Sequence, residues 1–246
     1  MKIKGDKMKN EEIKIKKPIW DGVSNKNKSV IVLMSGGLDS SVLTYKLAME
    51  YPKVLAIGFD YGQKNKNELE AAKKICKDFG IEYRILDATF IEKLSKNNYM
   101  FNVGTDIDIK NKNFIVPFRN GFFIEMAAIM AYNENYQYIA LGALLEEQVI
   151  ADKNKTFLLQ LQKTINTGIG DNFNIKIITP FIDELITKYR LFRVAKKYGI
   201  LEYLDKNIVT CYDGAVGILG CKKCGRCKAL KFQYDYFLFK EGELNA

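Results

Sequence analysis

The 246-residue sequence contains no histidine. This absence excludes acid–base catalysis by an imidazole and any histidine metal ligand, so carboxylates, lysines, thiolates, backbone amides or a bound metal ion have to supply the chemistry. The sequence also lacks a long hydrophobic run, since none approaches the ~20 apolar residues of a membrane span. Its basic first residues are not followed by the apolar core of a secretory signal. We therefore expect a cytoplasmic protein without a membrane partner.

Acidic residues are the scarcer charged class, with 29 Asp and Glu against 38 Lys and Arg and a formal net charge of +9. A positive excess favours anionic ligands, either nucleic acid or ATP and pyrophosphate. The lysines are spread along the chain and do not form one basic run with interleaved aromatics, so the charge alone favours neither. The length fits one α/β domain, or one domain with a small appendage.

The strongest local signal is the run Ser-Gly-Gly-Leu-Asp-Ser-Ser at residues 35–41. It follows the apolar, β-branched residues 30–34, which predict a buried strand, and precedes residues 42–48, which suit a helix. Unpaired N–H groups and the helix dipole favour an anion at such a turn, and glycines let the backbone approach phosphate oxygens. Asp39 is placed to hold a metal or a nucleotide group. An ordinary glycine-rich connection with a Ser/Asp helix cap is the alternative.

The rest of the central sequence alternates between predicted strands and helices. Strands are expected at 54–60, 83–87, 138–142 and 175–179, and helices at 67–79, 121–131, 156–167 and 185–198. This alternation predicts an α/β fold with a doubly wound, mostly parallel five-stranded sheet covered on both faces. Ligands of such sheets gather at the carboxyl ends of the strands, where the loop 35–41, the segment 60–63 and Asp87 should meet.

Three further segments each have two interpretations. Residues 1–28 are expected to form a loose arm, which either donates an edge strand at Ile13 and Ile15 or is a poorly ordered terminus. Residues 90–112 are polar and irregular, as in a loop over the site or an insertion without function. Arg119 and Asn120, just before a predicted helix, either bind a phosphate or carboxylate or are a surface arginine and a capping asparagine.

The tail carries the second strong signal, four cysteines. Cys211 is followed by Cys221, Cys224 and Cys227, which form a Cys-x-x-Cys-x-x-Cys run. Four thiolates without histidine fit a closed, tetrahedral structural zinc site, and an iron–sulfur cluster is the alternative. The remaining Cys76, on a predicted helix, is expected to be a small core residue. Basic residues surround the cluster, where they offset thiolate charge and could guide an anion: Lys222, Lys223, Arg226, Lys228 and Lys231.

The loop at residues 35–41 resembles the Ser-Gly-Gly-x-Asp-Ser pyrophosphate loop of the ATP pyrophosphatase (PP-loop) superfamily. Other matching pieces follow in order: Phe59-Asp60-Tyr61-Gly62-Gln63, Glu68-Leu69-Glu70-Ala71-Ala72, Val116-Pro117-x-Arg119-Asn120, Thr179-Pro180-Phe181, Cys211-Tyr212-x-Gly214 and Cys221-x-x-Cys224-Gly225-x-Cys227. Over about residues 30–232 the sequence therefore resembles the 7-cyano-7-deazaguanine synthase (QueC) family. The resemblance implies an adenine nucleotide alpha hydrolase-like, PP-loop domain at 29–200, after the arm at 1–28 and before a small zinc-binding region at 201–246.

The resemblance also implies the reaction, that of an ATP-dependent ligase. Such enzymes adenylate 7-carboxy-7-deazaguanine, let ammonia displace AMP to give an amide, and activate the amide with a second ATP to give the nitrile for queuosine biosynthesis. ATP phosphates and Mg²⁺ are expected at Ser35, Gly36, Gly37, Leu38, Asp39, Ser40 and Ser41, and the nucleotide or substrate at Tyr61, Gln63, Arg119 and Asn120. Asp39, Ser40 and Arg119 are the expected catalytic residues, and Zn²⁺ is expected at Cys211, Cys221, Cys224 and Cys227. A homodimer is expected on the same ground alone.

Two departures from the family pattern concern the substrate. Lys64 is followed by Asn65, where the family usually has a histidine. After Gly142 the family usually has Asp-(Tyr/Phe)-Ser-Gly-Tyr-Pro-Asp-Cys-Arg, which contributes to the deazapurine pocket. Here residues 145–153 read Leu-Glu-Glu-Gln-Val-Ile-Ala-Asp-Lys, with Asp152 a candidate for the later aspartate. We therefore expect the activation chemistry to be retained and the acceptor pocket to differ.

These departures keep other functions open. One is a QueC-like paralogue that adenylates a deazapurine or related carboxylate and transfers it to another amine, such as one on a protein, by analogy with QueC-like proteins in antiviral gene clusters. A tRNA-modifying PP-loop enzyme is disfavoured because the sequence has neither a separate RNA-binding domain nor a cysteine placed as a sulfur carrier, so nucleic acid is not an expected partner. A zinc-binding adaptor would leave the glycine loop unexplained.

Overall fold

The computed structural model describes residues 15–95, 98–101, 115–170 and 173–242. The edge strand predicted at Ile13 and most of the predicted loop at 90–112 lie outside these residues. Within the described part of the arm, residues 15–28 form no strand. The arm is nevertheless attached to the core, because the Tyr45 hydroxyl donates a hydrogen bond to the carbonyl of Lys16 at 2.8 Å.

A five-stranded parallel sheet forms the centre of the molecule, as predicted. Its strands are β1 (Ser29–Leu33), β2 (Lys53–Asp60), β3 (Glu82–Asp87), β4 (Tyr138–Ala140) and β5 (Lys176–Ile178), in the order β3-β2-β1-β4-β5. The chain leaves β1 toward one side of the sheet and later returns to the other. The order therefore reverses between β1 and β4, and sheets of this kind bind ligands at the carboxyl ends of the strands beside such a reversal.

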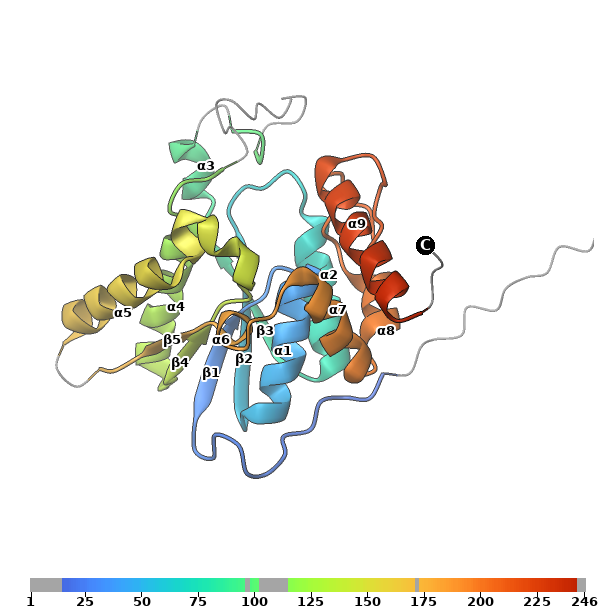
Figure 1. Cartoon of the computed structure of the whole chain (residues 1–246). Coiled ribbons are helices and arrows are strands. Elements are labelled where there is room, and N and C mark those ends of the chain that lie inside the picture. The colour runs from blue at the N-terminus through green and yellow to red at the C-terminus, as the bar shows by residue number, and fades with distance from the viewer. Residues whose placement is uncertain (1–14, 96–97, 102–114, 171–172, 243–246) are drawn as a thin grey trace, which may run out of the picture.

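Helices cover both faces of the sheet (Figure 1). Val30 and Val32 of β1 face one core, which is shared with α1 (Leu38–Glu50), α2 (Asn67–Phe79), α7 (Lys188–Lys197), α8 (Leu201–Asn207) and α9 (Gly225–Lys240). Ile31 and Leu33 face the other core, beside α3 (Phe90–Leu94), α4 (Arg119–Glu134) and α5 (Lys155–Ile169). Successive strand residues point to opposite faces, so the continuous apolar run of β1 fills both cores.

Several helix boundaries differ from the prediction. The helix α4 begins at Arg119, so Arg119 and Asn120 form its first turn and Phe118 is the N-cap. The helix α5 continues through Gly168, because its buried apolar side outweighs the low helix propensity of one glycine, and it ends at Ile169 with Gly170 as its C-cap. The helix α7 begins only at Lys188, since Leu185 has a φ of +54°, which a helix cannot contain.

Short helices and the tail complete the fold. The helix α3 lies in the segment predicted to be irregular, and α8 and α9 lie in the tail, where the sequence predicted only the metal site. Between β4 and α5 the chain forms two 3₁₀ turns, η1 (Leu145–Val149) and η2 (Ala151–Lys153), and α6 (Pro180–Asp183) follows β5. Among the described residues, no helix has the length and apolar content needed to cross a membrane.

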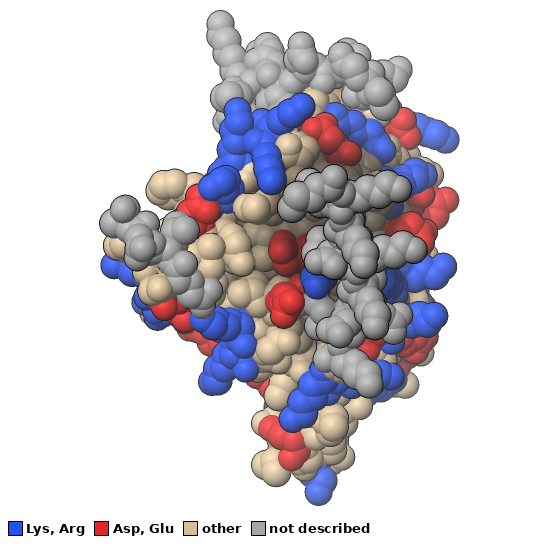
Figure 2. Space-filling view, turned by 90° about the vertical axis from the view of Figure 1, so that its right-hand side faces the viewer, with Lys and Arg blue, Asp and Glu red and all other residues tan. Residues whose placement is uncertain are grey.

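The surface charge is dispersed. Figure 2 shows lysines and arginines in several groups over one face, with acidic residues between them. A single continuous basic surface, which nucleic-acid binding proteins use to follow a phosphate backbone, is not present on the described part of this face.

Candidate functional site

The predicted phosphate loop joins β1 to α1 at the carboxyl edge of the sheet. The Ser40 hydroxyl lies 3.1 Å from the Ser35 hydroxyl and accepts a hydrogen bond from the Ser35 N–H at 3.2 Å. Ser41 is fully buried and donates its hydroxyl to the Gly37 carbonyl at 2.7 Å. The structure therefore presents Ser35 and Ser40 to the cavities described below, whereas Ser41 stabilises the turn of the loop.

Gly36 allows the loop to touch two other parts of the chain. Its φ is +83°, and a Cβ at this position would lie 2.1 Å from the carbonyl oxygen of Glu68. The carbonyl of Gly36 accepts a hydrogen bond from the N–H of Val209 at 3.1 Å. The first turn of α2 and the segment before Cys211 are thus packed directly against the loop, which only glycine permits here.

Two cavities, of about 170 and 310 Å³, flank the loop. The first lies toward β2, α2 and α4, and the second toward α7 and α9. They share five lining residues: Ser35, Asp39, Ser40, Glu147 and Arg226. A ligand that crosses the loop would have its central, anionic part at these shared residues and one end in each cavity.

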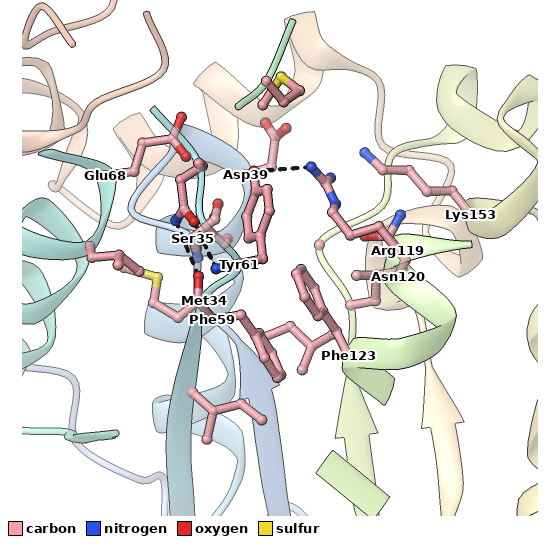
Figure 3. Close-up of a pocket in the computed structure, with 18 of the residues that line it drawn as sticks. Met34, Ser35, Asp39, Phe59, Tyr61, Glu68, Arg119, Asn120, Phe123 and Lys153 are labelled. Atoms are coloured by element: carbon pink, nitrogen blue, oxygen red, sulfur yellow. Dashed lines mark hydrogen bonds between the residues drawn. The ribbon is translucent and has the colours of Figure 1, made fainter. Parts of the chain in front are cut away.

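The first cavity has an aromatic wall. The rings of Phe59 and Phe123 are stacked, with centroids 4.0 Å apart, and the Tyr61 ring lies 5.5 Å from that of Phe123. Figure 3 shows these rings below and beside the loop. An aromatic wall with polar side chains around it is typical of a site for a planar heterocycle.

Arg119 lies over this wall. Its Nη1 donates a hydrogen bond to the Tyr61 hydroxyl at 3.2 Å, and its Cζ lies 5.2 Å from the Tyr61 ring centroid (Figure 3). Burial raises the pKa of the Tyr61 hydroxyl, and the Arg119 charge opposes that rise. The Nε of Arg119 is buried without a hydrogen-bond partner among the described residues. The arginine is therefore held in one orientation and retains a donor for a ligand.

Gln63 and Asn120 line the same cavity and form hydrogen bonds within the protein, Gln63 through its side chain and Asn120 through its backbone N–H. The Gln63 side chain accepts a hydrogen bond from the Tyr61 N–H at 2.9 Å and donates one to the Phe59 carbonyl at 3.1 Å. The N–H of Asn120 donates to the Asp152 carboxylate at 3.0 Å. Gln63 thus fixes the turn after β2 that carries Tyr61.

Opposite charges are paired along the rest of the site. Lys188, at the start of α7, forms an ion pair with Asp39 of the loop. Lys153 and Glu147 form a second pair, with 2.6 Å between Nζ and Oε1. Asp39 is therefore brought to the shared part of the two cavities together with a lysine that can offset phosphate charge.

The four tail cysteines form one compact cluster. Their Sγ atoms all lie within 4.8 Å of one another, with 4.0 Å between Cys211 and Cys224 and 3.9 Å between Cys221 and Cys227. Thiolates bound tetrahedrally to one Zn²⁺ at about 2.3 Å stand about 3.8 Å apart. In a four-iron cluster each thiolate binds a different iron atom, which requires a wider separation. The sulfur positions therefore fit a single tetrahedral ion, and they are too far apart for a disulfide.

Backbone N–H groups support this cluster. The N–H groups of Asp213 and of Cys224 lie 3.3 Å from the sulfurs of Cys211 and Cys221, and the N–H of Cys227 lies 3.4 Å from that of Cys224. Such bonds orient thiolates and disperse their charge in a metal site. Gly220 has a φ of +47°, and a Cβ there would lie 2.5 Å from the Cys227 sulfur, so the chain can pass this close only with glycine.

We compared the sequence with known protein families and with individual proteins. The profile of the family described as "Queuosine biosynthesis protein QueC" matches residues 29–235. The chain belongs to the QueC family. A 7-cyano-7-deazaguanine synthase of Clostridium novyi is 32% identical over 89% of this chain and 98% of its own length. Enzymes of the same name from Clostridium acetobutylicum and Helicobacter pylori are 33% and 32% identical, over 87% and 85% of this chain and 96% of their own lengths.

The residues that depart from the QueC pattern form hydrogen bonds within the protein. The side chain of Asn65 donates a hydrogen bond to the carbonyl of Cys211 at 2.9 Å, which joins the segment after β2 to the cysteine cluster. In the segment after Gly142, Asp152 accepts the hydrogen bond from Asn120, and Glu146 accepts one from the N–H of Lys188 at 2.7 Å. The altered residues therefore stabilise the starts of α4 and α7.

The structure brings most residues predicted for this QueC-family site into the two cavities. The first is lined by Ser35, Asp39, Ser40, Tyr61, Gln63, Arg119 and Asn120, and the second also by Gly37 and Leu38. Gly36 and Ser41 support the loop from behind. Cys76 is fully buried in the core, as predicted, and burial raises the pKa of its thiol to about 12.

Other polar lining residues were not assigned to the site from the sequence. Among them are Glu68, Glu147, Lys153, Lys188 and Thr210, which come from separate parts of the chain. Arg226 was predicted only as a charge beside the cysteines, although it lines both cavities. Lys188 could have been found from the sequence, because it directly follows the helix-capping Thr187 and the first turn of a helix binds anions. The remaining residues reach the site only through tertiary contacts, which no local pattern reports.

Proposed function

We propose that this protein is an ATP-dependent carbon–nitrogen ligase that converts 7-carboxy-7-deazaguanine and ammonia to 7-cyano-7-deazaguanine, as the names of its QueC relatives indicate. The observation that carries the proposal is the glycine loop at the reversal of strand order, with a cavity on each side of it. A carboxylate is activated when its oxygen attacks the α-phosphate of ATP, because AMP is a far better leaving group than oxide. Alignment of the two anions is the principal requirement.

The residues of the site fit this requirement. Loop N–H groups, Ser35 and Ser40 would bind the phosphates, and Lys188 would offset their charge. The Asp39 carboxylate would hold Mg²⁺ together with phosphate oxygens, and the ion would neutralise the departing pyrophosphate. The aromatic wall and Arg119 suit a planar heterocycle, either the adenine of ATP or the deazaguanine ring of the acid. Ammonia then attacks the acyl carbon and AMP leaves. A second ATP adenylates the amide oxygen, and loss of AMP and a proton leaves the nitrile.

The cysteine cluster would hold Zn²⁺ in a structural role, because all four coordination positions are taken by sulfur and none remains for a substrate. A homodimer remains part of the proposal, to be checked by sedimentation.

The test is a complete reaction. Purified protein with 7-carboxy-7-deazaguanine, ammonium and Mg–ATP should release pyrophosphate and AMP, while mass spectrometry detects first the amide and then the nitrile. ATP turnover without a nitrile would contradict the synthase and would indicate transfer of the activated acid to another amine.

Replacing Asp39 by Asn should reduce pyrophosphate release at least ~100-fold, since one metal-binding charge is lost at the reacting phosphate. The fold should persist, because a partly exposed ion pair contributes at most about 1 kcal/mol. Asp87→Asn is the matched control, since this carboxylate lies at the same edge of the sheet, outside both cavities. Equal turnover of the two variants would refute the role of Asp39.

A further inference from the structure

Arg226 connects the cysteine cluster to the two cavities beside the glycine loop. It stands between two cysteines of the cluster, in the first turn of α9, where the sulfur of the N-cap residue Cys224 accepts the N–H of Cys227. The position of its backbone is therefore fixed by the turn that would bind the metal. No other residue between the first and last cysteine of the Cys-x-x-Cys-x-x-Cys run lines either of the two cavities beside the loop.

The side chain of Arg226 extends from this turn to the phosphate loop. It lines both cavities at the residues that they share, next to Asp39 and Ser40. The ring of Tyr212 lies 5.5 Å from its Cζ and supports the guanidinium on one face. The side chain of Arg226 lies among other residues but is 45% exposed. The exposed part faces the two cavities.

The donors of this guanidinium are not used within the described residues. Its nearest carboxylate oxygen is that of Glu68, 3.8 Å from Nη1, which is an ion-pair distance but too long for a hydrogen bond. The other cations of the two cavities each have at least one partner. Lys188 binds Asp39, Lys153 binds Glu147, and one nitrogen of Arg119 binds Tyr61.

We propose that Arg226 is a polyphosphate-binding residue of this site, and that the metal ion in the cysteine cluster holds it in place beside the loop. The ligand class is pyrophosphate or the phosphates of a nucleoside triphosphate, since a planar guanidinium binds two phosphate oxygens at once. This inference rests on the use of ATP proposed above and is independent of which acid is activated. A structural metal site then controls the affinity of the site for its anionic ligand.

Binding of Mg–pyrophosphate, followed by calorimetry, tests the role of Arg226 directly. Arg226→Gln should weaken binding about 10- to 100-fold, the usual effect of one lost charge-assisted bond, while all four cysteines and one metal ion per chain remain. Lys228→Gln is the matched control, because it removes the same charge from an exposed position on the same helix and should change the affinity less than twofold. Arg226→Lys should recover part of the loss. Equal affinities of Arg226→Gln and wild type would overturn the proposal.

Metal removal tests the coupling. Stripping the metal from the wild-type protein should weaken pyrophosphate binding by a similar factor, whereas Arg226→Gln should lose little more when stripped. The same loss in both proteins would contradict a metal-held arginine. If the stripped chain unfolds, the equilibrium distribution of metal between the protein and a competing chelator replaces this measurement. By linkage, bound pyrophosphate should then raise the metal affinity of wild type and not that of Arg226→Gln. Normal pyrophosphate binding without nitrile formation would refute the synthase and leave this inference intact.

Discussion

Glu68 is a residue whose burial sets its chemistry. It stands in the first turn of α2, its side chain is 16% exposed, and it lines the first cavity, where one carboxylate oxygen lies 3.8 Å from Nη1 of Arg226. Burial raises the pKa of its carboxyl, and the charges of Arg226 and Arg119 oppose that rise. A carboxyl with a higher pKa in the folded than in the unfolded chain binds its proton more tightly when folded. Ionisation of Glu68 therefore lowers stability as the pH rises through its folded pKa.

Glu68→Gln should accordingly raise the free energy of unfolding at pH 8, because the carboxyl of residue 68 is ionised in the unfolded wild-type chain at that pH and burial opposes its ionisation in the folded one. The gain should vanish below the pKa of a glutamate in the unfolded chain, near pH 4, because the wild-type carboxyl is then protonated in both states. Urea denaturation at several pH values measures the difference. Glu70→Gln, at an exposed position on the same helix, is the control. A loss of stability at pH 8 would show that the arginines outweigh burial.

The residues of the site divide by how they could be predicted. The loop residues and Arg119 were identified because they are local in sequence and belong to runs with a chemical rationale. Glu68 was noted only as part of a run that matches the family, and it approaches the loop because Gly36 allows close packing. Arg226 was noted only as a charge beside the cysteines, and it approaches the loop because of the turn that those cysteines form. No sequence pattern reports such a tertiary contact, so neither was assigned to the site.

At the scale of elements, helix ends were predicted well where backbone chemistry is local. The helix α2 runs from Asn67 to Phe79, as predicted, and Gly80 ends it with a φ of +76°. Leu185 is the opposite case. Its φ of +54° follows from the turn after α6, and leucine gives no local sign of it. The helix α9 was missed because its sequence has no clear apolar face, with the exposed Phe232 and the buried Phe237 on one helix.

Leu185 and Leu159 give a direct test of this backbone argument. Their side chains are equally exposed, at 55% and 56%, but Leu159 lies inside α5. Glycine relieves the left-handed conformation at 185 by about 1 kcal/mol and costs about 1 kcal/mol inside a helix. Leu185→Gly should therefore be about 1–2 kcal/mol more stable than Leu159→Gly in urea unfolding. Equal stabilities would mean that position 185 carries no backbone strain.

At the scale of the whole molecule, the cysteine region and the PP-loop domain share one core. Phe237 of α9 is fully buried with its ring 5.6 Å from that of Phe192 in α7, in the same cluster as Val30 and Val32 of β1. The chain between them is joined to the loop through the bond from Val209 to Gly36. We therefore propose that residues 29–200 and the tail unfold together, although the sequence pattern divides them.

Loss of the metal should then destabilise the whole molecule. Cys224→Ser should abolish metal binding and lower the free energy of unfolding by several kcal/mol, because metal binding is part of the folding energy in such sites. At roughly 2–4 °C for each kcal/mol, Tm should fall by about 10 °C, in one transition. Cys76→Ser is the control, since it makes the same exchange at a cysteine outside the cluster and should keep the metal. Added zinc should stabilise Cys76→Ser and not Cys224→Ser in calorimetric scans. Two separate transitions, or a metal-free chain as stable as wild type, would show that the tail folds independently of the site it supports.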